Sequence, residues 1–349
     1  MEALAVVTRN DLIESVHYGT ICVTNSIGTV LYQLGSPDTS IFFRSSAKPI
    51  QVIPLLQSGA AKAYNFSLEE IALACSSHSG QGRHQAAVQK MLGRLKLGEK
   101  DLHCGIMMPY NADESNRLIS TGDKPSVFHC SCSGKHAAML ALASYKNLPI
   151  DTYEDLAHPV QQEILKTIAD FAELDPKSIP VGIDGCGVPI YLLPIRNIAQ
   201  SYGKLMYQAI HSHSPYHPAA KTVVDAMLAY PEMVSGDDEF CTDLMRLTHG
   251  KLIGKVGCEA VYCIGIRNQQ LGVCIKIVDG NERAIYPVVI HLLKQLNVLD
   301  EKEIETLKNW YHTPIYNNLK EQIGEVVPVF DIHQPKGAVP LLGKDIKDF

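Results

Sequence analysis

The sequence predicts an α+β fold in which an antiparallel sheet is flanked by helices, with an inserted mostly helical region. Segments rich in β-branched and aromatic residues, which favour strands, lie toward both ends of the chain. Segments with apolar residues at helical spacing fill most of the middle. This order is typical of one sheet, α/β sandwich-like, that takes strands from both termini.

The elements follow in order along the chain. Strands are expected at 3–7, 15–24 and 29–34, with a hairpin turn at Asn25-Ser26-Ile27-Gly28 between the last two. Helices are expected at 47–56, 68–74, 84–95, 137–145, 160–171, 195–209 and 219–229. Strands return at 251–257, 260–266 and 271–278, before a helix at 284–296 and a strand at 325–330.

The chain of 349 residues is long enough for a large buried core. We expect a single catalytic unit over 1–349, because the sequence contains no internal repeat and no long linker. Its α/β part is expected at about 1–60 plus 250–349, and the inserted helical part at about 61–249.

Composition and charge exclude several classes of protein. Hydrophobic residues make up 46% of the chain and charged residues 19%, which is typical of a globular protein. The formal net charge of -6 does not attract a polyanion, so we expect no nucleic-acid partner. No apolar run reaches the ~18 residues of a membrane span, and the acidic residues near the start do not fit a signal peptide. We therefore expect a cytoplasmic protein with no membrane association.

The segment RSSAKP at 44–49 opens an expected helix and carries a Ser-x-x-Lys pattern. Ser45 and Lys48 are three residues apart, so on a helix their side chains share a face. Serine becomes a nucleophile when a base takes its proton, and lysine is such a base once burial or nearby cations lower its pKa. The spacing indicates a catalytic pair, with a capping serine and a surface lysine as the alternative.

Two other segments support the catalytic interpretation. CSSHSG at 75–80 gathers hydroxyl groups at the end of an expected helix, either as a polar site or as a simple helix C-terminus. Lys255 lies between glycines on an expected strand, where glycine allows close approach of a ligand. An edge-strand lysine that hinders aggregation is the alternative. An early Ser-x-x-Lys followed by a late Lys-x-Gly is the order found in penicillin-recognising serine hydrolases.

The segment FHCSCSGKHAAML at 128–140 combines cysteine, lysine and histidine. It is not a phosphate loop, because Gly134-Lys135 is followed by histidine and position 129 lacks the required glycine. Cys130 and Cys132 also lack the spacing of a C-x-x-C redox pair.

A zinc site is one interpretation of this segment, and two unrelated turn cysteines are the other. Cys132, together with Cys186 in the turn DGCGVP at 184–189, would supply two thiolates. One nitrogen would complete three protein ligands and leave one position open for water or substrate. His136 or His129 is the usual type of nitrogen ligand, whereas Lys135 would have to bind as the neutral amine.

Taken together, these motifs resemble the class 3, or rhizobial-type, L-asparaginases, also called the asparaginase II family. The matching segments are RSSAKPIQ at 44–51, CSSHSGQ at 75–81, CSGKHAAML at 132–140, DGCGVP at 184–189 and GKVGCEAVY at 254–262. They follow the family order through most of the chain. The resemblance implies a fold similar to serine β-lactamases and glutaminases, and the hydrolysis of L-asparagine to L-aspartate and ammonia.

The resemblance also implies which residues act. It pairs Ser45 with Lys48 and Ser77 with Lys255 as two Ser-Lys tandems. It implies a zinc ion near the active site, not necessarily essential, and a homodimer. The metal ligands it implies are Cys132, Lys135 and Cys186, and Asp184 falls where the family has an acidic residue near metal and substrate. Arg44 is our candidate anchor for the substrate carboxylate, with a structural ion pair as the alternative.

The expected reaction begins with attack of Ser45 on the side-chain amide of asparagine, with Ser77 as the alternative nucleophile. A glutaminase or other serine amidase remains open, because one methylene discriminates by only ~1–3 kcal/mol. A catalytically silent, zinc-dependent amino-acid-binding protein is the third possibility. The chain departs from the family at Cys258 and Ala260, where alanine and glycine are more usual, and Cys130 adds a thiol beside the metal loop.

Overall fold

The structure is a computed structural model that describes residues 1–334. The chain divides into two compact units, each assembled from separate stretches of sequence. Unit 1 comprises Met1–Ser46, Leu193–Tyr207 and Asp243–Phe349, and unit 2 comprises Ala47–Leu192 and Gln208–Thr242. The expectation of a single catalytic unit stays a prediction.

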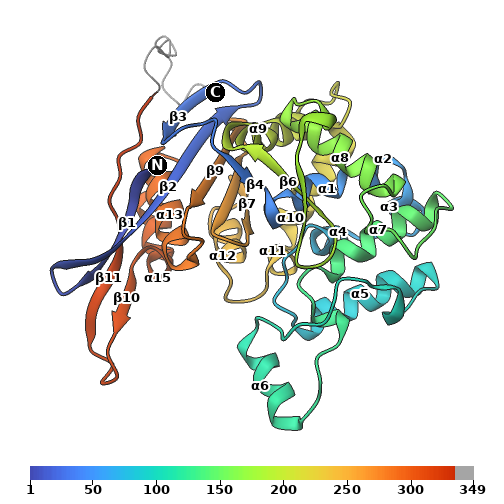
Figure 1. The fold of residues 1–349 in the computed structure, drawn as a ribbon, viewed down its shortest axis with the longest axis horizontal. Coiled ribbons are helices and arrows are strands. Elements are labelled where there is room, and N and C mark those ends of the chain that lie inside the picture. The colour runs from blue at the N-terminus through green and yellow to red at the C-terminus, as the bar shows by residue number, and fades with distance from the viewer. Residues whose placement is uncertain (335–349) are drawn as a thin grey trace. The chain divides into compact units, whose positions relative to one another are not determined.

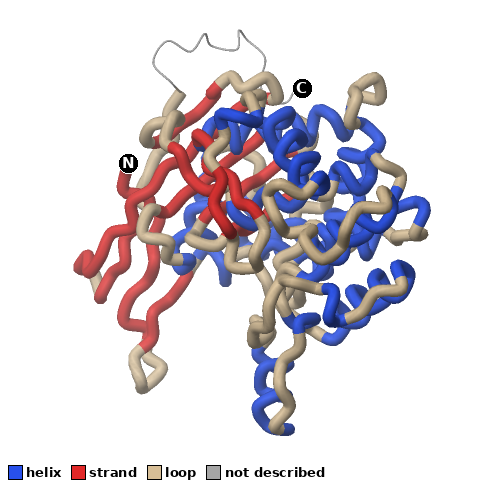
Figure 2. The backbone as a smooth tube through the Cα atoms, turned by 45° about the vertical axis from the view of Figure 1, so that its right-hand side comes forward, coloured by secondary structure: helices blue, strands red, loops and turns tan. Residues whose placement is uncertain are grey.

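Unit 1 contains an eight-stranded sheet whose strands come from both ends of the chain (Figures 1 and 2). The path runs β10-β11-β1-β2-β9-β8-β7, with β3 also paired to β2, and the neighbours are antiparallel. The predicted α+β fold with an antiparallel sheet is confirmed. The strands are β1 Glu2–Arg9, β2 Leu12–Asn25, β3 Val30–Leu34, β7 Leu252–Gly257, β8 Val261–Ile266, β9 Leu271–Ile277, β10 Thr313–Tyr316 and β11 Gln322–Pro328.

Helices of unit 1 cover this sheet by close packing. Helix α13 contacts β8, β9 and β11. Helix α9 approaches β9 so closely that a Cβ on Gly272 would lie 1.8 Å from the carbonyl oxygen of Ala199. Glycine at this position therefore allows the helix to reach the sheet. The remaining elements of this unit include β4 Ser40–Phe42, α9 Ile195–Ile210, α12 Phe240–Leu247, α13 Ile285–Gln295, α14 Glu301–Thr306 and α15 Lys308–Tyr311, of which α9 and α12 extend past the unit boundary.

Unit 2 is mainly helical, and its core forms around α4 and α7. Helix α4 begins at a capping box in which Ser67 and Glu70 exchange hydrogen bonds. Helix α7 buries every residue from Ser133 to Ala143, and its side chains are small or apolar without interruption from Ala137 to Ala143. The main elements are α1 Lys48–Gln51, α2 Ile53–Gln57, α3 Ala60–Ala63, α4 Leu68–Ala74, α5 Gly82–Leu95, α6 Ala112–Thr121, α7 Ser133–Tyr145, α8 Pro159–Ala172, β5 Val181–Ile183, β6 Pro189–Pro194, α10 His217–Ala229 and α11 Pro231–Val234, of which β6 extends past the unit boundary.

The predicted helix at 47–56 is wrong as a single element. The chain instead forms the 3-10 turn η1 Arg44–Ala47 and two short helices, α1 and α2. Pro49 and Pro54 each lie in the first turn of one of these helices. Proline has no N–H to donate and is tolerated in a first helical turn, so each one favours a new helix start.

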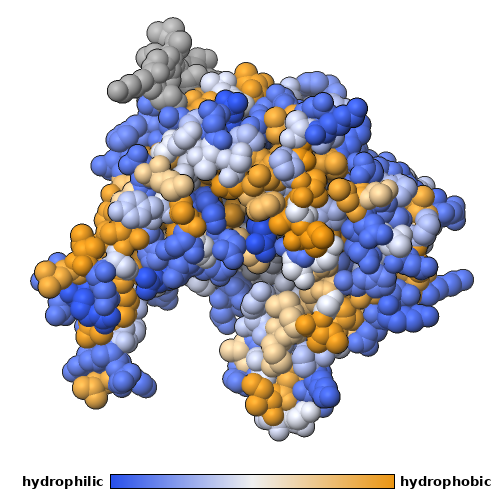
Figure 3. Space-filling view, in the orientation of Figure 1, coloured by the Kyte–Doolittle hydropathy of each residue, from blue (hydrophilic) through white to orange (hydrophobic). Residues whose placement is uncertain are grey.

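The described residues contain no helix that is long and apolar enough to cross a membrane. Some apolar side chains do reach the surface, as at the turn between β1 and β2, where Leu12 is 75% exposed and Ile13 65% exposed. Figure 1 shows the turn between β1 and β2 at the left of the view, and hydrophobic (orange) atoms lie at the same place in Figure 3.

Candidate active site and metal centre

The loop at 75–80 that follows α4, called the serine loop below, is held in unit 2 by backbone hydrogen bonds. The backbone N–H of Ser77 donates to the carbonyl of Val234 at 3.0 Å, and that of Ser79 donates to Ser235 at 2.6 Å. The Nζ of the buried Lys48 donates to the carbonyl oxygen of Ser76 at 2.5 Å and to the Ser77 hydroxyl at 3.0 Å. A lysine and a serine hydroxyl thus lie within direct proton-transfer distance.

This contact joins members of the two predicted tandems. The family resemblance pairs Lys48 with Ser45 and Ser77 with Lys255, whereas the structure places Lys48 beside Ser77. Ser45 belongs to η1, which leads directly into α1 with Lys48 at its first position. The two predicted pairings stay predictions.

Within unit 1, the chain around Ser45 packs against the strand that carries Lys255. A Cβ on Gly257 would lie 3.2 Å from the backbone nitrogen of Ser46 and 3.4 Å from the carbonyl oxygen of Phe43. Lys255 is two residues before Gly257 on β7, so both residues face the same side of the sheet. Lys255 is completely buried, which does not fit an exposed lysine that hinders edge-to-edge aggregation.

Arg44, immediately before Ser45, has a left-handed backbone with φ of 50°. This conformation costs a non-glycine residue of the order of 1–2 kcal/mol, and such strain concentrates at functional sites. The neighbouring turn is fixed by Tyr202, whose hydroxyl donates to the carbonyl of Ser46 at 2.7 Å.

The start of α7 presents Cys132 and Lys135 beside the serine loop. A Cβ on Gly134 would lie 2.4 Å from the carbonyl oxygen of Leu73, so glycine is what lets α7 approach α4. Lys48 reaches this segment as well, with its Nζ 3.3 Å from the sulfur of Cys132. The serine loop and the cysteine-lysine segment therefore form one connected site in unit 2.

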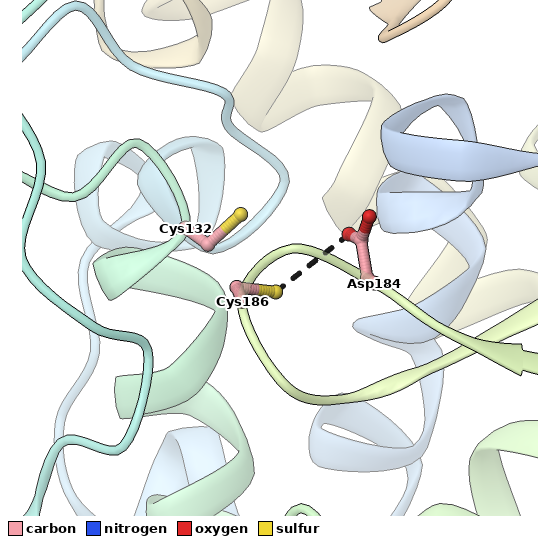
Figure 4. Close-up of side chains that lie close together, drawn as sticks. All are labelled: Cys132, Asp184 and Cys186. Carbon is pink, nitrogen blue, oxygen red and sulfur yellow. Dashed lines mark hydrogen bonds between the residues drawn. The ribbon is translucent and has the colours of Figure 1, made fainter.

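Cys186 and Asp184 reach the same place from the turn between β5 and β6. Gly187 completes this turn with φ of 90° and donates its N–H to the carbonyl of Asp184 at 2.9 Å. Ligand atoms of Cys132, Asp184 and Cys186 all lie within 4.8 Å of one another (Figure 4). The Cys186 sulfur is 3.6 Å from Asp184 Oδ2 and 3.2 Å from the Nζ of Lys135.

The charges of this cluster favour a thiolate. Hydrogen bonds from the Cys130 and Cys186 thiols, together with the charges of Lys48 and Lys135, lower the pKa of Cys132 well below its usual value despite burial. The pKa of Cys186 is raised, first by its hydrogen bond to Cys132 and then by burial. Burial lowers the pKa of Lys135, but the nearby sulfurs and Asp184 outweigh burial and raise it. The two sulfurs and the Asp184 carboxylate are donors that suit zinc and fit the implied metal. The raised pKa of Lys135 favours the ammonium while no metal is bound, so this amine would have to lose a proton to bind zinc.

The L-asparaginase II family model matches residues 5–328, nearly the whole chain. The chain belongs to the L-asparaginase II family. This asparaginase-family protein is therefore an amidohydrolase.

Several solved structures are similar in fold. One is a beta-lactamase candidate from Bacteroides dorei DSM 17855, with 12% identity, a TM-score of 0.41, and coverage of 79% of this chain and 93% of that chain. Another is Mglu in its native form in the presence of 4.3M NaCl, with 14% identity and a TM-score of 0.39, covering 82% of this chain and 63% of that chain. A comparison with curated proteins finds no match.

The two histidines near Cys132 in this asparaginase-family protein, His129 and His136, have other partners. His129 Nε2 lies 3.2 Å from Glu114, and its Nδ1 accepts the N–H of Ser126 at 2.9 Å. His136 Nδ1 lies 2.6 Å from the Tyr153 hydroxyl. Neither histidine belongs to the metal-compatible group found among the described residues.

Sequence reasoning assigned no role to His78, although it lies inside the quoted segment CSSHSG. Its ring is fully buried and hydrogen-bonded to Ser133, the residue after Cys132. The sequence does contain one signal for such a role. His78 lies between two serines, shortly before a glycine and shortly after a helix. The partner Ser133, 55 residues away, has no local signal in the sequence.

Proposed function

We propose that the protein is an L-asparaginase that hydrolyses the side-chain amide of L-asparagine to L-aspartate and ammonia. The observation that carries this proposal is the 3.0 Å contact between Lys48 Nζ and Ser77 Oγ in a member of the asparaginase II family. A buried amine touching a serine hydroxyl is one arrangement that can activate a serine for amide hydrolysis.

In the proposed reaction, Ser45 Oγ bonds to the amide carbon while its proton passes to Lys48. The resulting oxyanion is stabilised by backbone N–H groups near η1. The carbon–nitrogen bond then breaks, and a proton from Lys48 or from Ser77 coupled to Lys255 leaves with ammonia. Water cleaves the acyl-enzyme ester and releases aspartate, which restores the serine. Ser77 is the alternative nucleophile because it is the hydroxyl in contact with Lys48.

Substrate binding in this proposal uses Arg44 for the carboxylate and Asp184 near the metal and the substrate. Zinc would be held by Cys132, Lys135 and Cys186, with Asp184 close to the same atoms. When bound, zinc supplies a positive charge that orients substrate and stabilises negative charge nearby. The Ser-Lys groups supply the nucleophile without it.

Ammonia release from L-asparagine tests the proposal, with L-glutamine and a chromogenic β-lactam as competing substrates. We expect asparagine to be the best substrate, and Ser45→Ala to lower kcat by about 10²–10⁴. The matched control is Ser120→Ala, an exposed serine of α6. Loss of turnover in Ser77→Ala with near-normal turnover in Ser45→Ala would assign the nucleophile to Ser77.

Two further outcomes separate the other interpretations. Faster turnover of glutamine would indicate a glutaminase, and tight asparagine binding without ammonia release would indicate a binding protein. We also propose a homodimer in solution, which analytical ultracentrifugation of the purified chain measures directly.

A further inference from the structure

His78 connects the serine loop to the start of α7 through a chain of hydrogen bonds. The donor and the acceptor of each bond in this chain can be assigned. Its Nδ1 accepts the backbone N–H of Gly80 at 3.2 Å, so this nitrogen carries no proton. The ring proton is therefore on Nε2, which donates to the Ser133 hydroxyl at 2.8 Å. Ser133 in turn donates to the carbonyl of Phe128 at 3.3 Å.

The backbone of His78 adds a second link between the same segments. Its N–H donates to the carbonyl of Ser131 at 3.2 Å, so the loop is bonded on both sides of the Cys132 position. The neighbouring hydroxyls of Ser76 and Ser79 are buried and have no hydrogen-bond partner within the described chain. They therefore add no side-chain hydrogen bond that would hold the loop to α7.

A second histidine supports this ring from the other side. His84 stacks on His78 with ring centroids 4.9 Å apart and planes 27° apart. Its Nδ1 accepts the N–H of Gln81 at 3.1 Å, and its Nε2 donates to the carbonyl of Glu232 at 2.9 Å. The segment after Glu232 contains Val234, which accepts the N–H of Ser77. The stacked pair of His78 and His84 thus joins three segments around Ser77. They are the serine loop, the start of α7 and the segment that follows Glu232.

We propose that His78 is a positioning residue that keeps Ser77 and the metal-binding turn at the start of α7 in fixed relation, through Ser133. The inference rests on the proposed function for its effects on Zn²⁺ binding and on turnover, whereas the hydrogen bonds of His78 stand without it. Partners that orient metal ligands typically contribute 10–100-fold to metal affinity or activity. We expect the loss of His78 to weaken Zn²⁺ affinity by the same 10–100-fold, because its partner Ser133 directly follows Cys132.

The test compares His78→Phe, His78→Gln and Ser133→Ala with wild type. Zn²⁺ affinity, measured by competition with a chelating dye, should weaken about 10–100-fold in His78→Phe and Ser133→Ala. For L-asparagine, kcat should fall about 10-fold while KM changes much less, because misplacement affects the reacting geometry more than binding. His78→Gln keeps a donor near the Nε2 position and should recover most of both losses.

His158→Phe is the matched control, since this buried histidine of unit 2 also accepts the N–H two residues on at Nδ1 and donates at Nε2, there to a backbone carbonyl. Its Nδ1 accepts the N–H of Val160 at 3.2 Å, and its Nε2 donates to the carbonyl of Pro149 at 2.9 Å. The control should lose a similar amount of thermal stability while keeping Zn²⁺ affinity and kcat. Equal effects in His158→Phe and His78→Phe would reduce His78 to an ordinary structural residue and overturn the proposal.

Two readouts decide the proposal independently of asparagine turnover. Long-range ¹H–¹⁵N NMR should show the proton of His78 on Nε2, and a proton on Nδ1 would contradict the hydrogen-bond direction. If His78→Phe does not fold, Ser133→Ala decides, because it removes a single hydroxyl. Unchanged Zn²⁺ affinity in folded Ser133→Ala overturns the proposal, whereas an inactive wild type overturns only the proposed function.

Discussion

At the scale of single residues, Lys48 has the most connected position in the site. Its side chain is completely buried and its Nζ contacts the Ser76 carbonyl, the Ser77 hydroxyl and the Cys132 sulfur. One side-chain nitrogen therefore joins the serine loop to the start of α7, where Cys132 lies. Removing it leaves a buried carbonyl without its donor, which costs about 1–3 kcal/mol.

Lys48→Met should lower kcat for asparagine by at least about 10²-fold, because the base beside the serine hydroxyl is lost. Ammonia release measures the rate, and urea unfolding measures the accompanying loss of stability. The control is Lys90→Met on α5, whose lysine is exposed. A Lys48→Met protein that is folded and within a few-fold of wild-type kcat would contradict the assigned role.

Metal removal gives the second prediction at this scale. Cys186→Ser replaces a soft sulfur donor with a poor zinc ligand, so Zn²⁺ affinity should fall by at least about 10-fold. Chelator treatment of wild type should raise KM or lower kcat, and added Zn²⁺ should reverse the change. Unchanged zinc content in Cys186→Ser, measured by elemental analysis, would exclude Cys186 as a ligand.

At the scale of elements, two local backbone features allow predictions about stability. Gly134 lets α7 contact α4, and the β7–β8 turn places Glu259 and Ala260 in left-handed conformations with φ of 64° and 50°. The first feature is a close packing contact and the second is a strained hairpin turn. They predict opposite effects of substitution on stability.

Gly134→Ala should destabilise the protein by about 1–3 kcal/mol and weaken Zn²⁺ binding, because its Cβ would collide with the Leu73 carbonyl. The matched control is Gly93→Ala in α5, where a Cβ meets no atom within 4 Å. That substitution should stabilise the protein by about 0.5–1 kcal/mol through helix propensity. Urea unfolding measures both, and a stabilising Gly134→Ala would refute the close-contact explanation.

Ala260→Gly should raise stability by about 1 kcal/mol. The β7–β8 turn needs positive φ at Ala260, where glycine carries no Cβ penalty and is also the residue more usual in the family. Cys258→Ala, in the same turn but exposed, should change the melting temperature little. A lower melting temperature for Ala260→Gly would contradict the strain that we assign to this turn.

At the scale of the whole molecule, buried histidines make stability depend on pH. Burial lowers the pKa of His84 from 6.5 to about 4, although its bond to the Glu232 carbonyl opposes the shift. The unfolded chain therefore binds more protons between these values, and the free energy of unfolding falls as pH falls through this window. Burial also lowers the pKa of His78 and His136, which act in the same direction.

His84 alone should remove about 2 kcal/mol of stability between about pH 7 and about pH 5. Urea unfolding at the two pH values measures the change, and His84→Gln should show a smaller pH dependence than wild type. Equal pH dependence in both proteins would show that His84 is not protonated on unfolding in this range.

Local patterns in the sequence were enough for most of the long elements. Period-two and helical spacing predicted β2, α5, α8 and α9 within a few residues of their observed bounds. The turn at Asn25–Gly28 is confirmed by the bond from the Gly28 N–H to the Asn25 carbonyl. Short elements such as β5 were missed because three residues are too few to show a period.

The sequence by itself determined the α+β class, the family motifs and the residue types available for chemistry. Only the tertiary structure decided that Lys48 contacts Ser77 and Cys132, and that His78 bonds to Ser133. The physical reason is distance along the chain. Periodicity records which face of an element is buried, whereas the partner of a buried polar group depends on how α4 and α7 pack at Gly134.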